Sequence, residues 1–231
     1  MASLSRNCSP FMTQDKPPYA SRAGQKLKAA LDAFGLDVAG AREETLSGEA
    51  RWGGVRGGVR GLTCADLGCS TGGFTDYLLQ HGASHVYAVD TAYGELAWKL
   101  RQDPRVTVLE RSNALHLNPL APCDLVTIDL GWTPQRLAIP AAARWLADRP
   151  DARIITLVKP HYEATPDAMS GKRRGKLDDD QALAVTDRVL QDLEDKGFTA
   201  LNRVESPIRG GKGGNLEVLA LLCRSSDVSK P

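Results

Sequence analysis

Short, nearly continuous apolar runs alternate with amphipathic segments along most of this chain. A run that is apolar at every position is typical of a strand buried on both faces. Apolar residues spaced three and four positions apart are typical of a helix that lies on a core. The continuous runs predict strands at 62–66, 85–90, 106–110, 124–129, 153–158, 199–204 and 216–222. The amphipathic segments predict helices at 21–35, 74–81, 94–100, 134–147 and 179–196.

The order of these elements predicts the fold class. Strands that alternate with helices are typical of a parallel, doubly wound α/β sheet, because each helix carries the chain back across a face of the sheet. No helix separates the last two strands, so we expect the final strand to be antiparallel and inserted in the sheet. We expect a single domain at 21–224, with a flexible leader at 1–20 and a flexible tail at 225–231.

Composition narrows the class of protein. The chain has 231 residues, of which 42% are hydrophobic and 25% are charged, so it can bury a core without disulfides and is not disordered. No apolar window reaches the roughly 18 residues that a membrane helix needs, and the N-terminus lacks a secretory pattern. We therefore expect a cytoplasmic protein with no membrane partner. The five cysteines show no C-x-x-C spacing, which predicts neither a disulfide framework nor a metal site.

A glycine-rich loop, ADLGCSTGGFTD at 65–76, follows a predicted strand and opens a predicted helix. Its glycines allow a tight turn and a close approach to a ligand. Asp90 ends the next strand, where a carboxylate can accept hydrogen bonds from the ribose hydroxyls of an adenosine cofactor. The spacing G-x-x-x-G-G departs from the dinucleotide fingerprint, and Asp66 suits an amine or sulfonium cation better than a pyrophosphate. The loop predicts S-adenosylmethionine (SAM) as the cofactor, with a purely structural turn as the alternative.

Four charged residues lie in or beside apolar segments, where an unpaired charge is costly. Asp129 and Lys159 each end a predicted strand, and Glu217 lies inside a run that is apolar at its other positions. Lys26 lies beside the apolar stripe of the first helix. Ligands of open parallel sheets bind beyond the carboxyl ends of the strands, so these charges are candidate catalytic groups. The alternatives are a helix cap for Asp129 and a solvated surface lysine for Lys26.

Four motifs, taken in order along the chain, resemble the FtsJ-like RNA 2′-O-ribose methyltransferases, and most closely their TlyA or haemolysin-A-like branch. The motifs are SRAGQKLKAALDAFGLDV (21–38), the segment 65–114 that holds the glycine loop, LVKPHYE (157–163) and SPIRGGKGGNLEVLALL (206–222). The resemblance implies a Rossmann-like SAM-dependent methyltransferase fold whose last strand is antiparallel. It also implies that the enzyme transfers a methyl group from SAM to a ribose 2′-hydroxyl of RNA.

The resemblance assigns roles to particular residues. The catalytic Lys–Asp–Lys–Glu tetrad falls on Lys26, Asp129, Lys159 and Glu217. The SAM site falls on Asp66, Gly68, Ser70, Gly72, Gly73, Phe74, Asp90 and Asn113. In the implied reaction Lys159 orients the hydroxyl and deprotonates it, or assists its proton loss late in the transfer. Asp129 and Glu217 are expected to hold Lys159 in place, and Lys26 to help position the substrate.

The chain departs from this branch in three places. Members usually carry an N-terminal RNA-binding domain, which a leader of twenty residues cannot encode. The Gly/Arg-rich stretch near 41–61 corresponds to an insertion. The sequence LGWTPQ follows Asp129 in place of the family's Ser/Phe-containing turn, and the Trp132 ring there can stack on a base or pack under the next helix.

RNA is the expected partner, and ribosomal RNA is the class of RNA that we expect. The net charge of +1 is a cancellation between an acidic excess in 63–170 and basic excesses in 1–62 and 171–231. Basic runs on either side of the expected site can contact phosphates, and solvated loops are the alternative. The candidate RNA-binding residues are Arg51, Arg56, Arg60, Trp132, Lys172, Arg173, Arg174, Lys176, Arg209 and Lys212.

Three other functions fit parts of the sequence. The spacing of the glycine loop argues against a nicotinamide-dependent oxidoreductase. The lack of a membrane span and of a convincing basic amphipathic helix argues against a membrane-damaging protein. A non-catalytic RNA-binding or assembly protein that retains a SAM pocket is disfavoured by the complete set of four charged residues, and only a methyl-transfer assay separates it from the enzyme.

Overall fold

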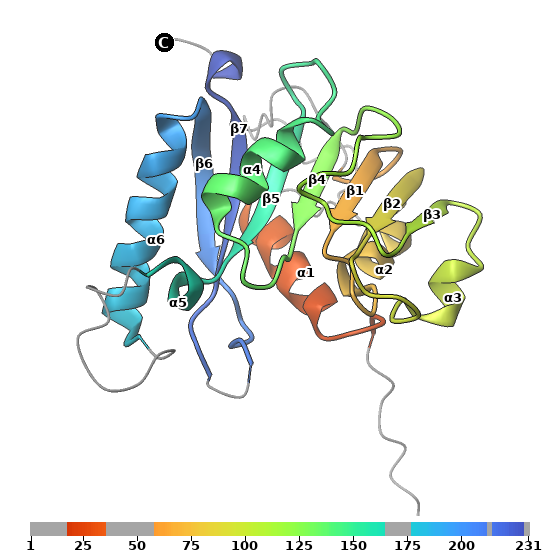
Figure 1. Cartoon of the computed structure of the whole chain (residues 1–231), viewed down its shortest axis with the longest axis horizontal. Helices are drawn as coiled ribbons and strands as arrows, with labels where there is room; N and C mark the ends of the chain where they lie inside the picture. Colours follow the sequence, from red (N-terminus) through yellow and green to blue (C-terminus); the bar gives the residue numbers. More distant parts are fainter. Residues whose placement is uncertain (1–17, 36–57, 165–176, 212–213, 229–231) are drawn as a thin grey trace, which may run out of the picture.

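Seven strands pair into one mixed sheet with the order β3-β2-β1-β4-β5-β7-β6 (Figure 1). The computed structural model describes residues 18–35, 58–164, 177–211 and 214–228. The strands are β1 (Thr63–Leu67), β2 (His85–Val89), β3 (Val106–Leu109), β4 (Leu125–Ile128), β5 (Arg153–Val158), β6 (Phe198–Glu205) and β7 (Val218–Arg224). The first five strands are mutually parallel, and β7 is antiparallel to both of its neighbours, β5 and β6. The predicted doubly wound sheet with an inserted antiparallel last strand is confirmed.

Helices cover both faces of the sheet (Figure 1). They are α1 (Ala23–Ala33), α2 (Gly73–Gln80), α3 (Trp98–Arg101), α4 (Gln135–Ala143), α5 (Pro160–Glu163) and α6 (Asp179–Glu194). Apolar side chains of α1, α2 and α3 pack on one face of the strands, and those of α4 and α6 pack on the other. Within β5, Ile154 faces the α4–α6 side and Ile155 the α1–α2 side, as the period of two along a strand requires. Burial on both faces explains the continuous apolar runs in the sequence.

Local signals fix several helix ends. Asp178 accepts a hydrogen bond from the Gln181 backbone N–H while the Gln181 side chain returns one, a capping box that starts α6. Ser21 Oγ accepts from the Ala23 N–H at 3.3 Å, although Arg22 occupies the cap position of α1. Gly35 follows α1 with φ +70°, a conformation that only glycine adopts without strain.

Two predicted helices are shorter than expected. The helix predicted at 94–100 is reduced to α3, because Gly94 has φ +81° and its N–H donates to Glu110 Oε1 instead of entering a helix. The helix predicted at 134–147 ends at Ala143, because Leu146 forms a bridge with Cys123 at the edge of the sheet. The helix α5, which directly follows β5, was not predicted.

The carboxyl ends of the parallel strands form one edge of the sheet, and this edge positions the candidate site residues. It carries the glycine loop after β1 and the residues after β4 and β5. The register pairs Val158 of β5 with Val218 of β7, so Lys159 and Glu217 meet at this same edge. No helix among the described residues is long and apolar enough to span a membrane. Most of the predicted leader and insertion, and the last three residues of the predicted tail, lie outside the described residues, at 1–17, 36–57 and 229–231.

Candidate active site

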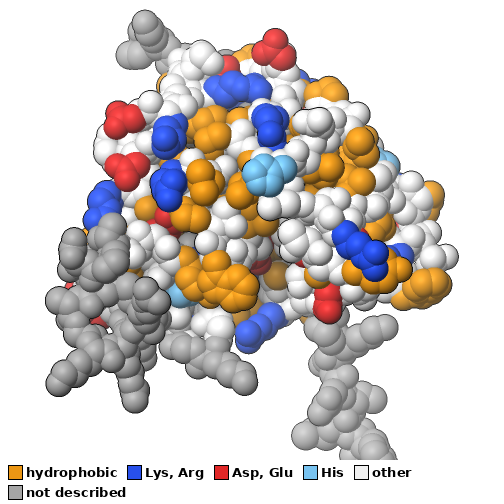
Figure 2. Space-filling view, in the orientation of Figure 1, with side chains coloured by type: hydrophobic (Ala, Val, Ile, Leu, Met, Phe, Trp, Pro, Cys, Tyr) orange, Lys and Arg blue, Asp and Glu red, His pale blue; other side chains and the backbone are white. Residues whose placement is uncertain are grey.

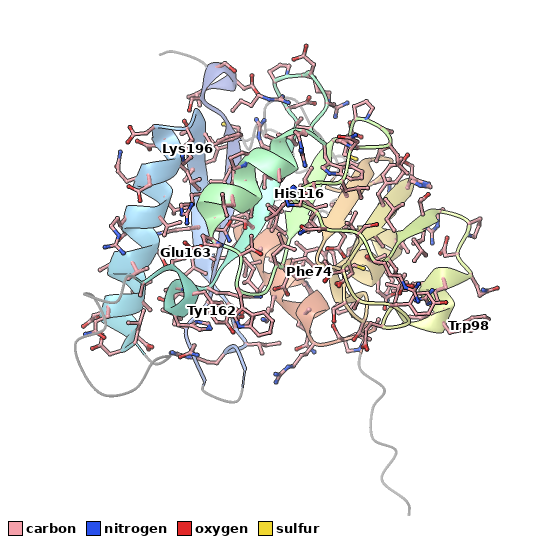
Figure 3. The ribbon with its side chains drawn as sticks, in the orientation of Figure 1. Phe74, Trp98, His116, Tyr162, Glu163 and Lys196 are labelled. Atoms are coloured by element: carbon pink, nitrogen blue, oxygen red, sulfur yellow. The ribbon has the colours of Figure 1, made fainter. Side chains whose placement is uncertain are left out.

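A pocket of about 220 Å³ opens at the carboxyl edge of the sheet, between α1 and the glycine loop. Figure 3 labels Phe74, one of its lining residues, in the lower half of the view, where Tyr162 also lies, and Lys196 in the upper half. The pocket brings together cofactor and catalytic candidates that are more than 100 residues apart in the chain. Its lining residues are Ser21, Arg22, Ala23, Lys26, Asp66, Gly68, Cys69, Ser70, Thr71, Phe74 and Asp129.

Lys159 and Asp129 form an ion pair beside this pocket. The lysine Nζ lies 2.5 Å from Asp129 Oδ1 and donates a second hydrogen bond to the Leu130 carbonyl at 3.1 Å. Both residues directly follow buried parallel strands, which explains why their side chains meet at the edge. Two of the three N–H groups of the ammonium are thereby fixed, and one remains for a ligand. Asp129 is therefore an ion-pair partner, and the alternative of a helix cap does not apply.

Lys26 and Glu217 form a second, more deeply buried pair, with Nζ 2.5 Å from Oε2. Lys26 is only 8% exposed, so the alternative of a solvated surface lysine is wrong. The expectation that Glu217 holds Lys159 also needs correction, because its carboxylate pairs with Lys26. The Glu217 side chain lies directly against Gly210, where an added Cβ would be 2.1 Å from Oε1. A loop without a side chain at Gly210 is thus needed for this placement of the carboxylate.

The glycine loop approaches the neighbouring strand closely. Gly68 has φ +89°, and a Cβ there would lie 2.6 Å from the carbonyl oxygen of Asp129. Gly72 has φ +96° and packs against Leu96 and Leu100. Glycine is therefore required at both positions for two reasons: the backbone has a positive φ, and neighbouring atoms leave no space for a side chain. Gly73 starts α2 and touches the segment that leads into α1.

Asp66 lies beneath the loop and is almost completely buried. Its Oδ2 accepts from the backbone N–H and hydroxyl of Thr75, at 2.9 and 2.7 Å, and its Oδ1 accepts from the Thr127 hydroxyl at 3.1 Å. Burial raises the pKa of Asp66 to about 6, and these hydrogen bonds oppose the rise. Sequence reasoning missed both threonines; the TGGFTD motif contains Thr75, but nothing links it to Asp66 before the fold is known.

Asp90 and Asn113 lie outside the pocket lining, after β2 and β3. The two carboxylate oxygens of Asp90 accept from the backbone N–H groups of Ser70 and Ala92, both at 2.8 Å. Asp90 thus shapes the glycine loop, and each of its oxygens keeps a free lone pair. Asn113 is exposed, and its side-chain oxygen accepts from the Leu115 N–H.

The chemistry of the pocket fits SAM. Carboxylates of Asp66 and Asp129 line the pocket and suit the positive charge of the cofactor, and Gly68 adds no side chain to this lining. Sites that enclose a whole drug-sized ligand measure about 300–1,000 Å³, so this pocket encloses only part of SAM. Burial raises the pKa of the Cys69 thiol far above its usual range, so this lining residue is no nucleophile. The described residues contain no cluster of three side chains able to hold a metal ion.

Two exposed aromatic rings lie at the same edge. Trp132 follows β4 with φ +54° and is 78% exposed, and Tyr162 of α5 is 40% exposed. Their ring centroids are 6.3 Å apart in an edge-to-face arrangement. Figure 2 shows hydrophobic side chains gathered at this lower edge, where Figure 3 labels Tyr162. Sequence reasoning named Trp132 and missed Tyr162, although its place three residues after Lys159 in LVKPHYE was a usable signal.

The basic candidates separate into three groups. Arg209 lies between β6 and β7 on the side of the site and makes a two-point ion pair with Asp179, at 2.5 and 2.7 Å. Arg60 precedes β1 and packs beside Gly82, so it lies at the opposite edge of the sheet and does not join the site. The other seven, Arg51, Arg56, Lys172, Arg173, Arg174, Lys176 and Lys212, lie outside the described residues.

Residues 19–222 match the family model of the FtsJ-like methyltransferases. The chain is a member of this family. It is 37% identical over 220 residues to the 16S/23S rRNA (cytidine-2′-O)-methyltransferase TlyA of Mycobacterium tuberculosis, a match that covers 94% of this chain and 72% of that protein. This FtsJ-like methyltransferase is therefore an enzyme that uses SAM, as its glycine loop predicts.

Solved structures agree with this membership. The FtsJ-like methyltransferase superposes on a protein from Streptococcus thermophilus that carries the name hemolysin, with a TM-score of 0.74 and 33% identity, over 92% of this chain and 69% of that one. An S-adenosylmethionine-dependent methyltransferase from Mesorhizobium loti, 18% identical, has a TM-score of 0.51 over 74% of this chain and 94% of that one. The second likeness concerns the fold alone and confirms the predicted SAM-methyltransferase fold.

Proposed function

We propose that this FtsJ-like methyltransferase transfers the methyl group of SAM to a ribose 2′-hydroxyl of ribosomal RNA. The observation that carries the proposal is the Lys159–Asp129 ion pair, fixed at the mouth of the pocket beside the glycine loop. The similarity to a relative named for 2′-O-methylation of cytidine in 16S and 23S rRNA supports the choice of substrate.

The reaction forms a bond between the ribose oxygen and the methyl carbon, breaks the bond between that carbon and sulfur, releases S-adenosylhomocysteine, and passes the hydroxyl proton to solvent late in the transfer. SAM supplies the electrophilic methyl group when it is bound. Lys159 orients the hydroxyl oxygen through its remaining N–H and assists the departure of the proton. Asp129 and the Leu130 carbonyl hold the amine in one position, so that little reorganisation is needed during transfer.

Lys26 and Glu217 act as a second, preset pair in this proposal. Their burial and the contact of Glu217 with Gly210 fix the Lys26 amine at the wall of the pocket. Lys26 is thereby placed to position the ribose, and Glu217 to hold Lys26. Asp90 and Asn113 would hold the adenosine of SAM, Asp90 through the ribose hydroxyls and Asn113 through the adenine.

The proposed RNA surface surrounds the mouth of the pocket. The exposed Trp132 and Tyr162 rings offer faces on which a nucleobase can stack. Arg209 lies on the same side and can contact a phosphate. The candidate basic residues at 51–56, 172–176 and 212 extend this proposal beyond the described part of the chain.

Methyl transfer from labelled SAM to purified ribosomal subunits and to free ribosomal RNA tests the proposal. A 2′-O-methyl group protects the adjacent phosphodiester from alkaline hydrolysis, because the attacking hydroxyl is blocked. We expect label to enter alkali-resistant dinucleotides with the wild-type enzyme and not with Lys159→Met. Label in a base, or SAM binding without transfer to any RNA, would contradict the proposal; the latter result would favour a non-catalytic RNA-binding protein.

A further inference from the structure

Asp76 of α2 is a buried carboxylate, 4% exposed, to which the reaction assigns no role. Its Oδ2 accepts from the backbone N–H of Ala20 and from Lys99 Nζ, both at 2.6 Å. Its Oδ1 accepts from the Gln80 side chain at 3.0 Å, and that amide also donates to the Pro18 carbonyl at 3.0 Å. One side chain thus joins α2, α3 and the segment before α1.

Two of these partners, Ala20 and Lys99, lead directly to walls of the cofactor pocket. Ala20 is followed by Ser21, Arg22 and Ala23, which line the pocket, and α1 then carries Lys26. Lys99 belongs to α3, and the Ala97 N–H just before this helix donates to the carbonyl of the pocket residue Thr71.

The first of these walls packs against Gly73, three residues before Asp76 on α2. A Cβ on Gly73 would lie 2.3 Å from Ser21 Oγ and 2.8 Å from Ala23 Cβ. The Asp76–Ala20 hydrogen bond lies next to this contact and holds the segment before α1 against α2. Close packing at this contact restrains movement of the pocket wall while that hydrogen bond is made.

We propose that Asp76 is a positioning residue that sets the width of the cofactor pocket and the reach of Lys26, by holding residues 18–23 against the glycine loop. It acts through Ala20 and contacts no reacting group. The effect on the cofactor follows from the use of SAM by this family, whereas the effect through Lys26 rests on the proposed function. Asp76 therefore contributes to both affinity and turnover, although it lies outside the pocket lining.

Asp124 offers a matched control at the opposite edge of the sheet. Its Oδ2 accepts from the Thr63 backbone N–H at 2.8 Å, and its Oδ1 pairs with the partly exposed Arg149 at 3.1 Å. Asp76 and Asp124 thus each bind one backbone N–H and one partly exposed cation. They differ in that only Asp76 binds a segment that lines the pocket.

The test compares the affinity for S-adenosylhomocysteine, measured by titration calorimetry, in the full-length Asp76→Ala, Asp76→Asn, Lys99→Met and Asp124→Ala proteins. Misplacing a positioned group by about 1 Å can cost up to roughly 100-fold in rate. We expect about tenfold weaker binding in Asp76→Ala and a smaller loss in Asp76→Asn, which keeps an acceptor for Ala20. Lys99→Met keeps the Ala20 bond and should lose less than threefold. Asp124→Ala should bind S-adenosylhomocysteine within twofold of the wild type, even if its melting temperature falls as far as that of Asp76→Ala.

Unchanged affinity in Asp76→Ala would overturn the proposal, and so would an equal loss in Asp124→Ala. If Asp76→Ala does not fold, Asp76→Asn decides, and wild-type affinity in that variant overturns the proposal. The rate of methyl transfer to RNA at saturating SAM is a separate readout. A weakened affinity with an unchanged kcat would support the effect on the cofactor and overturn the effect through Lys26. A wild-type protein that methylates no RNA would overturn the proposed function, while the calorimetric comparison would still decide the role of Asp76.

Discussion

The two edges of the sheet use charged residues in different ways. At the amino edge, Arg153 donates to the nearby carbonyls of Pro150 and Ala152, and Arg224 to those of Leu146 and Ala147. At the carboxyl edge, charges from distant parts of the chain pair with one another beside a pocket, as Lys26 does with Glu217 across 191 positions.

The comparison shows that the hydrogen-bond partners of a cation decide whether it stabilises the fold or serves the reaction. A guanidinium that donates to backbone carbonyls, as those of Arg153 and Arg224 do, ties neighbouring segments of the sheet together. A cation held by a carboxylate beside the pocket, as Lys159 is, keeps a fixed position and retains a free N–H donor. Strand β5 carries one of each, with Arg153 at its start and Lys159 directly after its end.

The largest expected contrast comes from replacing these two cations of β5. Lys159→Met should lower kcat for methyl transfer by about 10³-fold, within the range of roughly 10²–10⁴ for loss of a proton-transfer group. Arg153→Met should leave kcat of the folded enzyme nearly unchanged and lower the free energy of unfolding by about 2 kcal/mol, because the buried Ala152 carbonyl loses its side-chain donor. Transfer assays and urea unfolding measure the two effects. Similar losses of kcat in both variants would remove the functional distinction between the edges.

A second contrast uses pH and the buried carboxylate beneath the glycine loop. Burial raises the pKa of Asp66 from 3.8 to about 6, so between these values the folded state binds more protons than the unfolded state. The Asp66 contribution to the free energy of unfolding should therefore fall as the pH rises from about 4 to about 6, by up to about 3 kcal/mol, and stay low above that. Unfolding of the wild type and Asp66→Asn at several pH values isolates this contribution. An identical pH dependence in the two proteins would contradict it.

The fold could be predicted from the sequence because burial on both faces gives each strand a continuous apolar run. The helix at 94–100 was overestimated because its periodicity does not reveal that Glu110, directly after β3, binds the Gly94 N–H. The antiparallel direction of the last strand followed from the absence of a helix between the last two strands. The local hydrophobic pattern was therefore sufficient where the burial of a segment determines its structure. It failed where a contact with a residue distant in sequence determines that structure.

The candidate site shows the same division. Asp129 and Lys159 could be predicted because a charge at the end of a buried strand stands out locally. The Lys26–Glu217 pair could not, because it depends on α1 lying over the start of β7. The proximity of Arg60 to Arg51 and Arg56 in sequence grouped it with the RNA candidates, yet its place before β1 puts it at the far edge. Topology, which the order of apolar runs only partly reveals, decides which charges share a pocket.

Glycines at the two edges offer a smaller contrast. Gly68 at the carboxyl edge has φ +89° and Gly197 at the amino edge has φ +82°, but only at Gly68 would a Cβ meet other atoms within 4 Å. Gly197→Ala should cost about 1 kcal/mol in unfolding free energy, from the positive φ alone. Gly68→Ala should cost about 2 kcal/mol, because the contact with the Asp129 carbonyl adds to it, and should weaken SAM binding. Equal costs, with SAM affinity retained, would show that the close approach of the loop to β4 is unimportant.

The smallest expected effect concerns two matched surface arginines. Arg209 of the β6–β7 loop pairs with Asp179 at the start of α6, and Arg203 of β6 pairs with Asp187 of α6; the four side chains are about half exposed. Arg209→Ala should leave the melting temperature nearly unchanged, because exposed pairs contribute little. It should weaken RNA binding about equally for all sequences and lower the salt slope of the affinity by about one, whereas Arg203→Ala should change neither. Filter binding at several salt concentrations measures both slopes. Equal slopes in the two variants would mean that RNA does not reach the β6–β7 loop, and would confine the RNA surface to the side of Trp132 and Tyr162.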